Sequence, residues 1–93
     1  MEYILNNKPD FMKYLKSRFK MIHNSNFFFR DFHYGVLFYL QEHGIKKNYQ
    51  IAEKIARGIC ESFELQGIFK KIDHQTWTLN YPEFALPRIN KKT

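Results

Sequence analysis

The chain has 93 residues, 44% of them hydrophobic and 18% aromatic, which is enough for one small domain with its own core and argues against disorder except at the ends. Fifteen Lys and Arg against nine Asp and Glu give a formal net charge of +6. That charge favours a polyanionic partner, or it only keeps an aromatic-rich protein in solution. The single Cys60 excludes an internal disulfide.

The ends and the hydropathy of the chain bear on its location. The segment MEYILNNKPD has no secretory signal, and the longest apolar run, VLFYL at 36–40, is far below the roughly 20 residues that a membrane span needs. A free cysteine fits a reducing compartment. We therefore expect a cytoplasmic protein that makes no membrane contact.

Three helices are predicted in chain order. The first begins near Pro9, and the turn formers HNSN at 23–26 follow it. The second runs from about 28 to 43, with apolar residues spaced by four and Gly44 as its stop. The third begins after Asn48, a good N-cap, and ends at Gly67. The segment EYIL at 2–5 is compatible with a short extra strand.

A β-hairpin is predicted after the third helix. Trp77 alternates with Thr78 in the second strand, and DHQT at 73–76 supplies the turn. Lys70 and Lys71 are consecutive in the first strand, so they point to opposite faces. Trp77 is expected to anchor the core. The fold class is thus α+β, mainly α, in a single domain 1–93 with a core at about 9–84 and an extended basic tail at 85–93.

Two segments carry a resemblance to a known family. VLFYLQEHGIKKNYQIAEKI (36–55) resembles the opening of a winged helix-turn-helix domain, and FELQGIFKKIDHQTWTLNY (63–81) resembles that family's passage from recognition helix to wing. Together they cover about half the chain. The resemblance implies a DNA-binding fold, and therefore a cytoplasmic protein that takes part in transcription regulation.

The chain departs from the family pattern in its middle. Only residues 53–66 separate Ala52 from Gly67, which is several residues short of two helices and a turn. Either a turn interrupts this segment near Gly58, or residues 48–66 form one helix with Gly58 inside it. The unbroken apolar face favours one helix. Its charged residues sum to −1, which is unfavourable for contact with phosphates.

The candidate contacts to nucleic acid, DNA rather than RNA, are therefore chiefly phosphate contacts made by the inter-helix turn, the third helix and the hairpin. The primary candidates are Lys46, Lys47, Arg57, Lys70, Lys71 and His74. A secondary basic face comprises Lys13, Lys16, Lys20, Arg88, Lys91 and Lys92.

A second hypothesis is a non-catalytic protein–protein interaction module, a homodimer or an adaptor, on the same fold. NFFFRDFHY at 26–34 holds more aromatic side chains than one helical face can bury. Such side chains stack on bases, bind a partner, or pack under the chain termini. The candidate interface comprises Phe27, Phe28, Arg30 and Tyr34.

No catalytic or cofactor motif is present. His23, His33, His43 and His74 are scattered without metal-ligand spacing, and Cys60 has no activating motif nearby. We therefore expect no enzyme, no metal and no cofactor.

Overall fold

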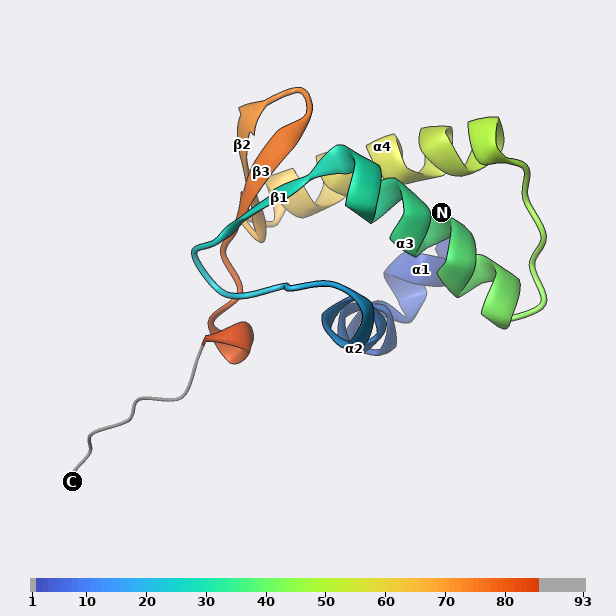
Figure 1. The fold of residues 1–93 in the computed structure, drawn as a ribbon, viewed down its shortest axis with the longest axis horizontal. Coiled ribbons are helices and arrows are strands. Elements are labelled where there is room, and N and C mark those ends of the chain that lie inside the picture. The colour runs from blue at the N-terminus through green and yellow to red at the C-terminus, as the bar shows by residue number, and fades with distance from the viewer. Residues whose placement is uncertain (1, 86–93) are drawn as a thin grey trace.

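The computed structural model describes residues 2–85 (Figure 1). Helices and a small antiparallel sheet share one core, so the predicted α+β, mainly α, class is confirmed. In chain order the elements are α1 (Glu2–Asn6), α2 (Lys8–Arg18), β1 (Asn26–Phe28), α3 (Phe29–Glu42), α4 (Tyr49–Leu65), β2 (Phe69–Asp73), β3 (Thr76–Leu79) and a 3₁₀ turn η1 (Pro82–Phe84).

The sheet has three strands in the order β1-β3-β2, all antiparallel. The predicted hairpin is present as β2 and β3. The third strand is not the predicted one: EYIL lies in α1, and the third strand is β1 at Asn26–Phe28. The N–H of Asn7 donates to the carbonyl of Ile4, and the N–H of Phe11 donates to the carbonyl of Asn7. These bonds join α1 to α2, so the N-terminal segment is helical rather than a strand.

β1 arises from a segment predicted as turn and helix start. Asn24 has a positive φ of 70°, which reverses the chain after α2. Its N–H then donates to the carbonyl of Leu79, and the N–H of Leu79 donates to Ser25. These non-local hydrogen bonds place residues 26–28 beside β3. No local pattern in the sequence predicts them.

α4 is one continuous helix, as the apolar face of residues 48–66 favours. The side chain of Asn48 accepts a hydrogen bond from the N–H of Ile51 at 2.8 Å, which confirms the predicted N-cap. Gly44 and Gly67 follow α3 and α4 with φ of 76° and 78°, a backbone region that favours glycine. No separate short helix lies between Ala52 and Gly67.

The core joins the inner face of the sheet to α3 and α4. The Phe69 ring lies 4.7 Å from the Phe27 ring, 5.3 Å from Phe32 and 5.1 Å from Phe63, centroid to centroid. Trp77 is 1% exposed, and its indole N–H donates to Glu64 at 2.8 Å, so its predicted role as core anchor is confirmed. The core also includes Ile4, so it begins before the predicted start at residue 9.

Candidate nucleic-acid interface

α3 and α4 form a helix–turn–helix pair joined by residues 43–48, here called the inter-helix turn. The N–H of Ile45 donates to the carbonyl of Leu40 at 2.8 Å, which closes the end of α3. Lys46 and Lys47 follow and are exposed. The hairpin comes directly after α4, so the order of elements is the one on which the family resemblance rests.

The hairpin, here called the wing, is tethered to α4 by Arg57. The Arg57 guanidinium donates to the backbone carbonyl of His74 at 2.5 Å and lies 3.7 Å from the centre of the Phe29 ring. The Trp77 ring is 5.9 Å away. The tether therefore holds the tip of the wing beside the middle of the helix, and the Arg57 side chain is engaged within the protein.

The two wing lysines lie on opposite faces of the sheet, as their consecutive positions predict. Lys70 is opposite Thr78, and Lys71 is opposite Trp77. Lys71 shares the inner face, yet both lysines are exposed. Within residues 2–85 the only ion pairs are Arg18–Glu42 and His43–Asp10, so no carboxylate neutralises either wing lysine there.

The structure brings only some of the predicted contacts together. In Figure 1 the inter-helix turn and the wing lie at opposite ends of α4, and α2 lies on the other side of α3. Lys13, Lys16 and Lys20, on and after α2, therefore belong to another face, and Lys16 lies 5.0 Å from the centre of the Phe84 ring. Arg88, Lys91 and Lys92 lie outside the described residues.

The charge of α4 is less adverse than its sequence suggests. Glu64, one of three carboxylates between 48 and 66, accepts the Trp77 hydrogen bond and is half-buried. Glu53 and Glu61 remain exposed, as does Lys54. The solvent face of α4 thus carries mixed charge, whereas the inter-helix turn and the wing at its two ends carry exposed lysines that form no ion pair within residues 2–85.

The predicted partner interface is divided by the structure. Phe27 is only 7% exposed and belongs to the core, so its assignment as a contact residue is wrong: its side chain is on the inner face of β1. Phe28, next to it, is 59% exposed, and Arg30 is exposed too. Tyr34 is half-buried.

An aromatic cluster at the α3–α4 corner has no counterpart among the sequence predictions. Tyr34 stacks on Phe38 at 5.9 Å and contacts the Tyr49 ring at 5.8 Å. A hydrogen bond with Tyr34 raises the pKa of the Tyr49 hydroxyl. The spacing of residues 34 and 38 shows that they share a helix face, but only the packing of α4 against α3 brings Tyr49 there.

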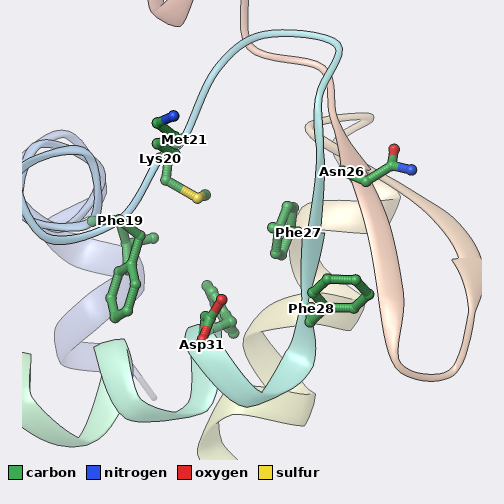
Figure 2. A pocket seen from close by; sticks show the side chains of 9 residues that line it. Phe19, Lys20, Met21, Asn26, Phe27, Phe28 and Asp31 are labelled. Atoms are coloured by element: carbon green, nitrogen blue, oxygen red, sulfur yellow. The ribbon is translucent and has the colours of Figure 1, made fainter.

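A pocket of about 200 Å³ lies between α2, β1 and the start of α3 (Figure 2). The sequence does not predict its lining, because loop 19–25 contributes residues that no motif connects to β1. Apolar side chains form most of the wall, and Lys20, Asn26 and Asp31 are the polar members. Phe19 and Phe27 lie on opposite sides of it in Figure 2.

Cys60 and three of the histidines, which are the residue types that act as nucleophiles or metal ligands, are buried or hydrogen-bonded within the protein. Burial raises the pKa of the Cys60 thiol to about 12, so the thiol stays protonated at neutral pH. The ring of His33 hydrogen-bonds the carbonyl of Tyr49, and that of His43 the carbonyl of Tyr39. The N–H of Tyr81 donates to His23. Residues 2–85 contain no group of three His, Cys, Asp or Glu side chains placed to hold a metal ion.

No family model matches this chain, and no curated protein or solved structure shows significant similarity to it. Among the described helices, none is both long enough and apolar enough to pass through a bilayer.

Proposed function

We propose that this chain is a small winged-helix-like protein that binds nucleic acid, with duplex DNA as the preferred form. The observation that carries the proposal is the Arg57 tether, because it makes α4 and the wing one rigid surface. Lys70 and Lys71 then contact phosphates on one flank of α4, and Lys46 and Lys47 contact phosphates at its other end. His74 lies at the wing tip, within reach of the same backbone.

Charge supports this assignment. Lysines that form no ion pair attract a polyanion and release its counterions, so they give affinity without reading sequence. Arg57 acts here as a positioning residue, since its guanidinium is bound to the wing and to an aromatic ring. The mixed charge of α4 agrees with binding through the backbone rather than through base edges. A regulatory role in transcription and a cytoplasmic location follow only as parts of this proposal.

A second candidate function is a protein–protein interaction module. It is favoured by exposed apolar side chains spread over the surface, of which Leu65 at 91% and Phe28 at 59% are the most open among the described residues. Leu65 lies at the end of α4 and Phe28 on β1, so both are close to the wing but are not part of it. A homodimer or another protein would cover them.

The decisive experiment is a fluorescence-anisotropy titration of the whole chain with a short DNA duplex at several salt concentrations. The double variant Lys70→Glu, Lys71→Glu should weaken binding by at least about tenfold and lower the slope of log K against log salt by about 0.9 for each phosphate that is no longer neutralised. The matched control is Lys13→Glu, Lys16→Glu, at two exposed positions of α2, which changes the net charge equally on another face.

Equal weakening by the two double variants would show that only the total charge matters and would reject the wing. Absence of binding by the unaltered protein at tens of micromolar would reject the whole proposal. A sedimentation measurement on the same samples would then reveal a dimer, if the exposed apolar side chains serve that purpose.

A further inference from the structure

The pocket beside β1 has walls suited to a flat aromatic ring. Phe19 is half-buried, Phe27 and Phe32 are buried, and Met21 closes another side. A cavity of about 150 Å³ accommodates a benzene ring, so one of about 200 Å³ has room for a single nucleobase but not for two stacked bases. Stacking on aromatic side chains is a common way to hold an unstacked base.

Two side chains of opposite charge stand at this pocket. Asp31, in the first turn of α3, lies between Phe19 and Phe27 in Figure 2, and Lys20 lies on the loop above them. Both are exposed, and within residues 2–85 neither forms an ion pair or a side-chain hydrogen bond. A ligand that pairs with both side chains must offer hydrogen-bond donors to Asp31 from the edge of an aromatic ring, and a negative charge to Lys20.

That combination is the chemistry of a nucleotide. An apolar side chain of a protein partner would leave both charges unused, and an alkylammonium group would meet Asp31 but be repelled by Lys20. Among the bases, guanine presents two adjacent N–H donors that match the two oxygens of a carboxylate. Adenine, cytosine and thymine each place a ring nitrogen or carbonyl acceptor next to their donor, which a carboxylate repels.

The rim of the pocket indicates a strand rather than a free nucleotide. Phe28 lines the pocket and is 59% exposed, so a base next to the captured one can stack on its ring. Beyond Phe28 the outer face of the sheet continues through Thr76 and Thr78 to Lys70. A single strand that leaves the pocket therefore has an aromatic platform and a cation along its path.

We propose that this pocket takes one unstacked guanine of a single-stranded nucleic acid, with Asp31 accepting its two N–H donors, Lys20 contacting its phosphate and Phe28 stacking on the neighbouring base. The proposal rests on the proposed nucleic-acid binding and adds a pocket beside β1, whose strand path shares only Lys70 with the duplex contacts of the wing.

The test uses twelve-nucleotide oligo-dT strands with dG, dA, dC or dT at one central position, titrated against the whole protein by anisotropy. We expect the dG strand to bind about tenfold more tightly than the others, and Asp31→Asn to abolish that preference. Glu2→Gln, which removes an exposed carboxylate elsewhere, should leave it unchanged. Phe28→Ala should weaken all four strands by about tenfold, whereas Phe38→Ala, at another exposed phenylalanine, should not.

Each outcome decides between the two proposals. If the protein binds a duplex but treats all four strands alike, or if Asp31→Asn keeps the dG preference, the guanine pocket is rejected and the wing stands. If it binds neither duplex nor single strand, both proposals fail. Guanosine monophosphate that competes as well as the dG strand would assign the pocket to a free nucleotide and reject the single-strand site.

Discussion

The two faces of the three-stranded sheet differ sharply, although they are built from alternating residues of the same strands. The inner face carries Phe27, Phe69 and Trp77, each at most 7% exposed, against α3 and α4. The outer face carries Asn26, Phe28 and Lys70, and no helix of the described chain covers it.

This contrast separates the residues that stabilise the molecule from those available for recognition. On the inner face the Phe27 ring lies 4.7 Å from the Phe69 ring and 6.1 Å from the Trp77 ring, centroid to centroid, and these rings exclude water. On the outer face the hydroxyl of Thr78 donates to the Asn26 side chain at 2.8 Å, an exposed bond that adds little to stability. Changes to the buried rings of the inner face should therefore affect folding, and changes to the exposed side chains of the outer face should affect binding.

The strongest test of this contrast uses two consecutive phenylalanines. Phe27→Ala removes a buried ring from the inner face and should lower the free energy of unfolding by about 3–5 kcal/mol. Phe28→Ala removes an exposed ring and should cost less than about 1 kcal/mol. Urea unfolding followed by tryptophan fluorescence measures both, and equal losses of stability would contradict the assignment of the two faces.

A smaller effect is expected at the tether between α4 and the wing. Arg57→Ala removes a cation–π contact and a charged hydrogen bond, so it should destabilise the protein by about 2 kcal/mol and loosen the wing. Lys54→Ala, at an exposed site on the same helix, serves as the control and should stay within about 0.5 kcal/mol. Faster amide exchange at the wing in both variants would argue against the tether.

The smallest effect is expected at the wing turn and depends on pH. The Gln75 N–H donates to the Asp73 carboxylate at 2.8 Å and lowers the pKa of Asp73 below its ordinary value of 3.8. The charged carboxylate therefore stabilises the fold at pH values above 3.8, and this contribution is lost as the pH falls through the lowered pKa. Asp73→Asn should show a shallower loss of stability on acidification, measured by urea unfolding between neutral pH and about pH 2.5. Identical pH profiles would rule out this role for Asp73.

Several elements could be predicted from the sequence because their signals are local. Asn48 and Gly67 delimit α4, and the alternation around Trp77 with a polar turn before it marks the hairpin. An apolar stripe that continues through Gly58 favours one helix for residues 48–66, and the structure confirms it. Each of these signals depends on the preferences of single residues or on a periodicity that the chain carries in itself.

The remaining features required the folded chain, because they depend on residues far apart in the sequence. β1 forms by pairing with β3, and hydrogen bonds between Leu79 and residues 24 and 25 extend that pairing. That pairing points the Phe27 side chain into the core and the Phe28 side chain into solvent. The run of aromatic residues in NFFFRDFHY does not predict which of the two is buried. The same pairing fixes β1 between α2 and the start of α3, and so creates the pocket that Asp31 and Lys20 both line.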